Sequence, residues 1–326
     1  MRLIDSQGRN INYMRLAVTD RCNLRCVYCM PKAGIAKKGH DAILSYEELL
    51  FVAETAVGLG IEKIRITGGE PLVRAGIVPF LDRLAEIPGL RHLVLTTNGL
   101  ALEDMAGDLY RSGVQRLNVS LDSLDGKTFA GITRGGDLKK VLSGLDAAEQ
   151  AGFPPPKINM VVMRGVNDAE IPDFVEMART RGTTIRFIEY MPVGWEDGWQ
   201  RYCVPGSEIL ERIRARYTLV EVHKGPSAGP SRDFRIPGSR GAVGIITAVS
   251  EHFCNACNRI RVTSTGQARG CLFAGEAADL VPWLRPADRS GLAGALSEIV
   301  SRKPVRHRIS APGHSHERFT MSQIGG

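Results

Sequence analysis

Short apolar segments rich in β-branched residues alternate with segments of helical period as far as about Tyr190. The strand candidates are Arg15–Thr19, Lys63–Thr67, His92–Thr97, Arg116–Ser120, Lys157–Val162 and Thr184–Tyr190. The helix candidates between them are 45–58, Val78–Ile87, Leu102–Ser112, Leu138–Gly152 and Ile171–Arg181. Ser45 can cap the first of these helices while Glu48 reaches back to it. Repeated strand–helix units predict a parallel sheet covered by helices, as a doubly wound open sheet or as all or part of a barrel.

The pattern changes in the second part of the chain. Glycine, proline, serine and tryptophan are frequent in Met191–Pro205 and His223–Gly241, which are expected to form long loops or covers. The remaining expected elements are a helix over Ser207–Tyr217, a strand over Ala242–Ala248, a hairpin of Arg259–Thr263 with Gln267–Leu272, and a helix over Asp288–Arg302.

Unusual residues follow the predicted strands directly. They are Cys22, Cys26 and Cys29 after the first strand, Gly68–Pro71 after the second, Asn98–Gly99 after the third, and Asp122 after the fourth. In both candidate architectures, ligands bind at the carboxyl ends of the strands. The sequence therefore predicts one active site that collects residues from successive strands.

Composition and charge limit the function classes only loosely. The 326 residues are 43% hydrophobic and 24% charged, which is ordinary for one large or two smaller globular domains. The net charge of +7 suggests an acidic ligand, such as a phosphate, a nucleic acid or a membrane surface, without choosing among them. No apolar run reaches signal-peptide length or the roughly 18 residues of a membrane span. We expect a cytoplasmic protein whose 7 cysteines are metal ligands or catalytic thiols rather than disulfides.

The first triplet is Cys22, Cys26 and Cys29. Three thiols at this spacing converge on one centre only if the backbone loops around it, and thiolates in a reducing compartment select zinc or an iron–sulfur cluster. A structural zinc site has four protein ligands. A triplet without a nearby fourth ligand favours a four-iron cluster with one open iron, with zinc and a distant fourth ligand as the alternative.

The second triplet is Cys254, Cys257 and Cys271, for which His252 is the nearest candidate fourth ligand. Arg259 and Arg261 follow it, and arginine binds phosphate oxygens well because it is always charged and donates as a fork. This favours a second cluster with an open iron, over a zinc site or a solvated hairpin. Cys203, the seventh cysteine, is expected to be a free, partly buried thiol.

Two sets of motifs resemble known families. Cys22-x3-Cys26-x2-Cys29 with Tyr28, followed by Gly68-Gly69-Glu70-Pro71, resembles the radical S-adenosylmethionine (SAM) superfamily. From Leu3 to Gly325-Gly326, the chain is similar to the family of GTP cyclases that begins molybdenum cofactor synthesis. The further segments that carry this resemblance are Thr19–Pro31, Arg65–Leu72, Leu95–Gly99, Asn118–Leu124, Arg186–Pro192 and Phe253–Arg261.

The resemblance implies a fold, an activity and a site. The fold would be an incomplete (β/α)6 TIM-type barrel over residues 1–220, with a C-terminal domain over 221–326 covering the open side. The activity would be a lyase reaction that converts GTP to 3′,8-cyclo-7,8-dihydro-GTP, with two 4Fe–4S clusters bound by the two triplets and SAM on the first. The SAM contacts would be Tyr28, Gly69, Glu70, Ser120 and Met191. The GTP contacts would be Arg15, Lys63, Arg65, Thr96, Lys157, Arg186, Arg259, Ile260 and Arg261.

The C-terminal end of the chain with its two glycines, called the tail below, and the partner proteins are the last features for which the sequence gives expectations. Gly325 and Gly326 could be a frayed end, but without side chains they could also enter a narrow active site, and in the family they are thought to support catalysis. The resemblance implies a flavodoxin- or ferredoxin-type electron donor and, as functional partner, the cyclic pyranopterin monophosphate synthase of the next step. A monomer or homodimer that binds neither membrane nor nucleic acid is expected.

Two other functions remain open from the residues. A radical SAM enzyme that modifies a peptide would need a peptide-docking element and an auxiliary cluster with all its irons ligated. A zinc-dependent nucleic-acid-binding protein would explain the basic charge, but no recognition motif is present and aromatic residues are only 6%.

Overall fold

The computed structural model describes residues 2–36, 38–191, 198–223, 225, 229–307 and 320–325. The strands are β1 (Tyr13–Ala17), β2 (Lys63–Thr67), β3 (His92–Thr97), β4 (Arg116–Ser120), β5 (Lys157–Val162), β6 (Thr184–Glu189), β7 (Val220–Val222), β8 (Arg232–Arg235), β9 (Ala242–Ile246), β10 (Arg259–Val262), β11 (Gln267–Arg269) and β12 (Ala278–Asp279). The helices are α1 (Tyr46–Gly58), α2 (Ile77–Ala85), α3 (Leu102–Arg111), α4 (Gly126–Thr133), α5 (Leu138–Gln150), α6 (Ile171–Arg181), α7 (Gly206–Arg214), α8 (Arg289–Ser301) and α9 (Met321–Ile324).

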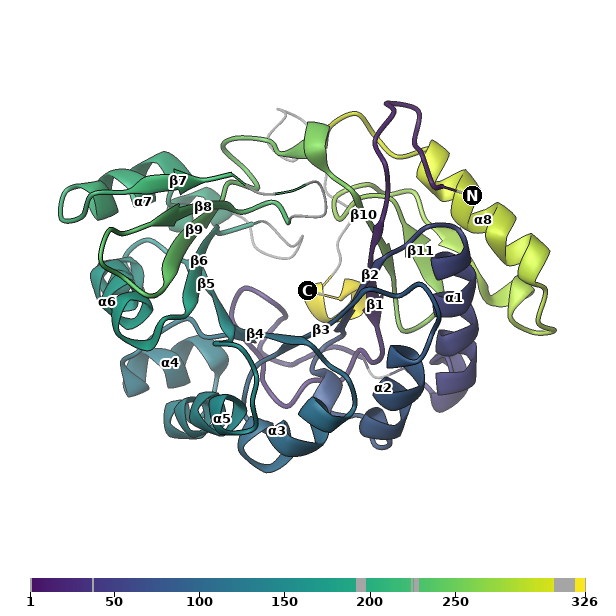
Figure 1. Ribbon diagram of the computed structural model, residues 1–326, viewed down its shortest axis with the longest axis horizontal. Helices are drawn as coiled ribbons and strands as arrows, with labels where there is room; N and C mark the ends of the chain where they lie inside the picture. The colour runs from purple at the N-terminus through teal and green to yellow at the C-terminus, as the bar shows by residue number, and fades with distance from the viewer. Residues whose placement is uncertain are drawn as a thin grey trace.

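The described strands form one twelve-stranded sheet in the order β12-β11-β10-β1-β2-β3-β4-β5-β6-β9-β8-β7. Strands β1 to β6 are parallel neighbours, and β10 and β9 extend them in parallel on either side. The sheet curves into an open barrel with helices on its outer face (Figure 1). This confirms the predicted incomplete barrel, and strands from the C-terminal part of the chain extend both of its edges.

The first strand–helix unit shows how the sequence specifies the layers. Ser45 caps α1, and the Glu48 side chain accepts from the Ser45 backbone N–H, as predicted. The inner face of α1 buries Leu49 and Ala53 against the apolar side of the sheet. Such burial is worth about 1.5–3 kcal/mol for a leucine side chain.

The chain end lies inside the barrel. Helix α9 occupies the middle of the ring of strands, far from the outer helices (Figure 1). Its first backbone N–H, of Met321, donates to the Cys29 carbonyl over 3.2 Å. No helix in the described part of the chain is both long and apolar enough to cross a bilayer.

Candidate active site

One large cavity inside the curved sheet holds both cysteine triplets. It contains about 1890 Å³ of space, part of it open to solvent. Its walls come from the inward faces of β1 to β6, β9 and β10 and from the loops that follow them.

Alternation along the strands decides which side chains reach the cavity. On β1, Tyr13 and Arg15 line it, whereas Met14 and Leu16 are fully buried in the core behind the sheet. The other barrel strands follow the same rule, because successive side chains of a strand point to opposite faces. The inward face of β1 and β2 is mainly polar, whereas β5, β6 and β9 add Val161, Ile188 and Ile246; the outward face is apolar core.

The loop of the first triplet is anchored to the ends of two neighbouring strands. All three thiols line the cavity. The Tyr28 hydroxyl donates to Asp122 over 2.7 Å, and Asp122 also accepts from the Val161 N–H over 2.8 Å. The Asn98 amide donates to Asn23 over 2.7 Å. These hydrogen bonds within the chain hold the loop around its three thiols without help from a ligand.

Burial governs the ionisation of this first site. It raises the pKa of Cys22 to about 11 and that of Cys29 to about 12. It also raises the pKa of Glu70 to about 7 and that of Asp122 to about 6. The site therefore disfavours uncompensated negative charge and gains from a positively charged occupant.

The glycine pair after β2 is required by the packing of the chain itself. A Cβ on Gly68 would lie 2.4 Å from the Thr19 carbonyl oxygen, and one on Gly69 would lie 2.3 Å from the Arg21 carbonyl oxygen. Two backbone hydrogen bonds of 2.8 Å hold the segments together. The Gly69 N–H donates to the Thr19 carbonyl, and the Glu70 N–H donates to the Arg21 carbonyl. The glycines thus allow the loop of the first triplet to pack onto the end of β2.

The Glu70 carboxylate already has three donors. It accepts from the Leu72 N–H over 3.1 Å, the Thr97 hydroxyl over 2.8 Å and the Asn98 N–H over 2.7 Å. A carboxylate has about four lone-pair positions, so one further donor can still bind. Glu70 therefore positions the loops as well as lining the cavity.

The second triplet lies across the cavity in a cationic setting. Burial alone would raise the pKa of Cys257, but the charges of Arg259 and Lys303 outweigh it and lower that pKa to about 6. Burial raises the pKa of Cys254. All three thiols of the triplet line the cavity.

The spacing of the thiols tests what each triplet fits. One zinc ion bound by three thiolates would bring their sulfur atoms to within about 3.8 Å of one another. Among the described residues, the metal-ligand group whose atoms all lie within 4.8 Å of one another is His252, Cys254 and His307. Among those residues neither triplet forms such a group, so its three thiols are not arranged here around one ion.

Three arginines line up beside the second triplet on adjacent strands. Arg15 of β1 pairs in register with Arg261 of β10 and with Arg65 of β2, and we call these three the arginine row. Burial, with Arg261 and Arg65 adding to it, lowers the pKa of Arg15 well below its usual value. Burial, then Arg259, lowers the pKa of Arg261 to about 10. Such a row favours a polyanion that neutralises it.

Several buried polar atoms near the row have no hydrogen-bond partner in the described chain. They are Nε of Arg65, Nε of Arg186 and Oγ1 of Thr96, all of cavity-lining residues. Arg186 is otherwise held by Asn118, whose Oδ1 accepts over 3.2 Å. Unsatisfied buried donors are costly, so these atoms indicate where a ligand binds.

The tail reaches both sites. The Arg261 guanidinium donates to the Gly325 carbonyl over 2.6 Å, while Met321 lies against the loop of the first triplet. Gly325 has φ +82°, and a Cβ there would lie 2.6 Å from Thr67 Oγ1. Gly326 lies outside the described residues.

Comparison with known proteins gives two adjoining family matches. Residues 16–178 match the Radical SAM superfamily, and residues 183–309 match Molybdenum Cofactor Synthesis C. A GTP 3′,8-cyclase of Geobacter sulfurreducens is 62% identical over the whole of both chains. The chain belongs to the GTP 3′,8-cyclase family. A second relative of that name, from Moorella thermoacetica, is 46% identical over 99% of each chain.

Solved structures share the fold of this GTP 3′,8-cyclase family member. A structure of anSMEcpe with bound AdoMet superposes with a TM-score of 0.60 at 15% identity, covering 88% of this chain and 82% of that one. Streptococcus suis SuiB gives 0.58 at 15% identity, covering 82% and 62%. Membership of the radical SAM superfamily implies a 4Fe–4S cluster and SAM. The family and fold expected from the motifs are confirmed.

Most of the expected contacts of this family member line the one cavity. All five predicted SAM contacts do so: Tyr28, Gly69, Glu70, Ser120 and Met191. Six of the predicted GTP contacts do so as well: Arg15, Arg65, Thr96, Arg186, Arg259 and Arg261. Their roles remain predictions.

Three predicted GTP contacts lie outside the cavity lining. The Lys63 ammonium lies 4.8 Å from the Tyr13 ring centre, one level below the arginine row. Lys157 begins β5 and is half-buried. Ile260 is fully buried behind the sheet, so only its backbone could meet a ligand.

Several residues that line the cavity were not among the predicted site residues. Tyr13 and Asn159 share the inward alternation of Arg15 and Lys157 on their strands, so strand period would have found them. His307 also lines the cavity, but it follows the last long helix and no local signal marks it.

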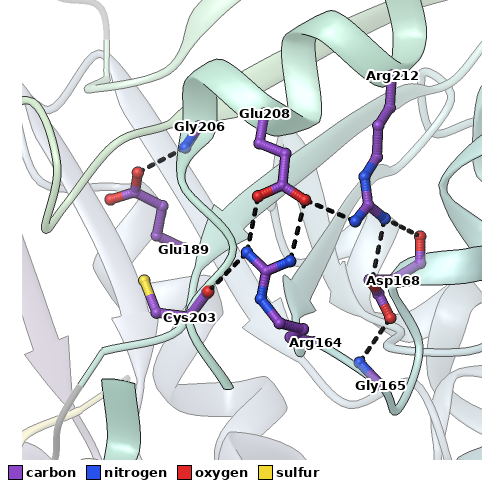
Figure 2. A network of polar contacts seen from close by, with 8 residues as sticks. All are labelled: Arg164, Gly165, Asp168, Glu189, Cys203, Gly206, Glu208 and Arg212. Atoms are coloured by element: carbon purple, nitrogen blue, oxygen red, sulfur yellow. Dashed lines mark hydrogen bonds and ion pairs between the residues drawn. The ribbon is translucent and has the colours of Figure 1, made fainter. Parts of the chain in front are cut away.

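The seventh cysteine belongs to a separate network. The Arg164 guanidinium donates to the Cys203 carbonyl over 3.3 Å and pairs with both oxygens of Glu208 (Figure 2). Arg212 links Glu208 to Asp168, which ties the start of α7 to the loop after β5. The Cys203 thiol is free and half-buried, as predicted.

Proposed function

We propose that this chain catalyses GTP 3′,8-cyclisation and that the cavity inside the curved sheet brings SAM and GTP together. The observation that carries this is that both triplets and the arginine row line the same cavity. A radical formed at the first triplet would then meet a nucleotide held at the second without leaving the cavity.

The first triplet would hold the superfamily's 4Fe–4S cluster, and Tyr28, Gly69, Glu70, Ser120 and Met191 would hold SAM. When bound, the reduced cluster would supply one electron to the sulfonium of SAM, which would release methionine and provide a 5′-deoxyadenosyl group able to take hydrogen from ribose C3′ of GTP. Glu70 has room for one more donor, which fits the methionyl amine. A buried site that disfavours negative charge fits the sulfonium cation.

The second triplet would hold a second 4Fe–4S cluster with an open iron for guanine. In the described part of the chain its three thiols do not form a single-ion group, which supports a larger centre. The lowered pKa of Cys257 supplies a thiolate ligand near neutral pH.

The triphosphate of GTP would lie on the arginine row, with Arg259, Arg186 and Thr96 beside it. A triphosphate carries about three to four negative charges, which the clustered guanidiniums can neutralise. Arg15 and Arg65 occupy the third position of their five-residue strands, below the loop of the first triplet. The phosphates would therefore reach down into the barrel rather than stay at its mouth.

The tail would complete the nucleotide site. Gly325 and Gly326 present only backbone, and the Gly325 carbonyl already accepts from Arg261. Holding that guanidinium in one orientation would preorganise it for phosphate, so we assign the tail a positioning role.

Product analysis tests the proposal directly. The full chain, reconstituted anaerobically with iron and sulfide, is incubated with GTP, SAM and a reductant, and the nucleotide is identified by mass and proton NMR. The expected product is 3′,8-cyclo-7,8-dihydro-GTP with one 5′-deoxyadenosine per turnover. Deoxyadenosine without any change in GTP would contradict the assignment.

Metal analysis tests the second cluster separately. Two cubes give about eight irons per chain and no zinc. Roughly four irons plus one zinc would leave the radical SAM site intact and remove the second cluster. A second cluster with four protein ligands would favour the peptide-modifying alternative instead.

We also propose two functional partner proteins for this chain. A flavodoxin- or ferredoxin-type protein would supply the electron, and a cyclic pyranopterin monophosphate synthase would use the product. The match to Molybdenum Cofactor Synthesis C supports this pathway setting.

A further inference from the structure

Two histidines and one cysteine form a compact group at the edge of the second triplet. The ligand atoms of His252, Cys254 and His307 all lie within 4.8 Å of one another. His252 Nδ1 and His307 Nε2 are 3.1 Å apart, with the rings nearly perpendicular at 84°. His307 is only 8% exposed and lines the cavity. Nothing in the proposed cyclisation uses these two imidazoles.

The surrounding chain fixes this group in place. The His307 backbone N–H donates to the Cys254 sulfur. The Arg9 guanidinium bridges the two segments, donating to the Cys254 carbonyl over 2.7 Å and to the Pro304 carbonyl over 2.8 Å. The buried Lys303 ammonium holds the same segment against the Arg259 carbonyl over 2.9 Å. The group is therefore preorganised by chain contacts that do not depend on a ligand.

The dimensions of the group suit one tetrahedral ion. Two nitrogens that each lie 2.0–2.1 Å from a tetrahedral zinc are roughly 3.3 Å apart. The 3.1 Å between the two rings is close to that separation. Without an ion, the same two nitrogens can share one proton. Two imidazoles and one thiolate are a zinc-type ligand set, and water or a cavity ligand can take the fourth position.

We propose that a chain lacking its second cluster binds one zinc-type divalent ion through His252, Cys254 and His307. The ion and the cluster exclude each other because both require the Cys254 sulfur. The metal site stands on its own geometry, whereas the exclusion rests on the proposed function. Zinc would thereby block loading of the second cluster while leaving the first untouched.

Cobalt(II) provides the direct test because its absorption reports ligand type and geometry. The host is the full chain with Cys22→Ala, Cys26→Ala and Cys29→Ala, purified without iron, so that the first triplet cannot bind metal. One equivalent of Co²⁺ should give the visible bands of a tetrahedral site and charge transfer from one thiolate. His252→Ala and His307→Ala should each weaken binding by more than about tenfold, the scale that even outer-shell changes reach.

Matched variants separate this site from a site made of the triplet. His40→Ala removes an exposed histidine and should change nothing. Cys271→Ala should also leave cobalt affinity within about twofold, since Cys271 is not in the group. His252 is only half-buried, so its removal leaves the fold intact even if His307→Ala does not. Loss of binding in Cys271→Ala but not in His252→Ala would place the ion among the thiols and overturn the proposal.

Competition with iron tests the exclusion. The intact chain is preloaded with one equivalent of Zn²⁺ and then reconstituted anaerobically. Iron should fall from about eight to about four per chain, and His252→Ala should load fully despite the zinc. Full iron loading of the zinc-treated intact chain would overturn the exclusion. If the zinc-free chain itself takes only four irons, the second cluster fails while the cobalt result still decides the metal site.

Discussion

The two thiol triplets share one cavity but differ in the charges that surround their thiols. Around the first, burial raises the pKa values of the thiols and of the neighbouring carboxyl groups Glu70 and Asp122. Around the second, Arg259 and Lys303 outweigh burial and lower the pKa of Cys257 to about 6. One wall of the cavity therefore suits a cation and the other an anion.

This difference supports the proposed placement of the two small molecules. SAM carries a sulfonium and an ammonium group, so its reactive end suits the first triplet. GTP is a polyanion and suits the second triplet with the arginine row. In this placement each ligand would offset a charge that is unfavourable at that site, which would favour it over the other ligand.

The largest expected effect comes from replacing one cysteine in each triplet, because each replacement should abolish a different activity. Cys22→Ala should abolish SAM cleavage while GTP binding persists, because the arginine row is untouched. Cys257→Ala should abolish the cyclised product while uncoupled SAM cleavage continues. Deoxyadenosine, cyclised nucleotide and iron are measured for both, and each variant should lose about four irons. Equal loss of SAM cleavage in both variants would show that the triplets do not act as separate sites.

The next largest effect is thiol reactivity in the metal-free chain. At pH 7 Cys257, with a pKa of about 6, is mostly thiolate, whereas Cys22, with a pKa of about 11, is almost wholly thiol. Lower intrinsic nucleophilicity offsets part of this, so Cys257 should alkylate roughly a hundredfold faster. Iodoacetamide labelling read by peptide mass spectrometry checks this.

The pH dependence of the labelling rate tests the direction of the two pKa shifts. The rate at Cys257 should rise from pH 5 to 7 as the thiolate forms and then level off, while that at Cys22 keeps rising to pH 10. Arg259→Leu should move the Cys257 curve to higher pH. Identical curves for the two thiols would remove the electrostatic contrast.

The barrel could be predicted from sequence because each of its strands has a local signal. Four strands begin and end at the predicted residues: Lys63–Thr67, His92–Thr97, Arg116–Ser120 and Lys157–Val162. Each is a short, largely apolar run bounded by turn residues. The first strand was placed two residues late, because Tyr13 joins it by pairing with Arg259, far away in the chain. Helix α4 was missed because its segment is rich in glycine and threonine, which are weak helix formers.

Site residues that lie close together in the sequence could be predicted. Site residues that only the folded structure brings together could not. Each triplet has a readable spacing, and the arginines of β1, β2 and β10 alternate visibly. That Arg261, Arg15 and Arg65 share one level depends on strand register, which the sequence does not show. His307 meets His252 from 55 positions away, through the packing of the segment after α8.

A smaller effect is expected from one arginine of the row. Arg65→Leu removes a half-buried guanidinium whose buried Nε has no partner in the described chain, so folding should tolerate it. One charge-assisted hydrogen bond is worth about 1.5–3 kcal/mol, so the Kd for GTP should rise by about tenfold to a hundredfold. Calorimetry should show unchanged SAM affinity. Arg83→Leu, at an exposed ion pair on α2, is the matched control, and an equal effect there would exclude a local role for Arg65.

The smallest expected effect concerns the tail, the segment that touches both walls. In Gly325→Ala, the new Cβ would lie 2.6 Å from Thr67 Oγ1 and 3.0 Å from the Ala17 Cβ, at a φ of +82°. Left-handed backbone costs an alanine about 1–2 kcal/mol, so the tail should shift and weaken the Arg261 contact, lowering kcat for the cyclised product about fivefold. Iron content and uncoupled SAM cleavage should not change. Gly238→Ala carries the same strain at φ +75° with no atom within 4 Å, and isolates the contact from the strain. If both alanines lower kcat alike, the tail acts through stability; if only Gly325→Ala does, the tail couples the cationic wall to the loop of the first triplet.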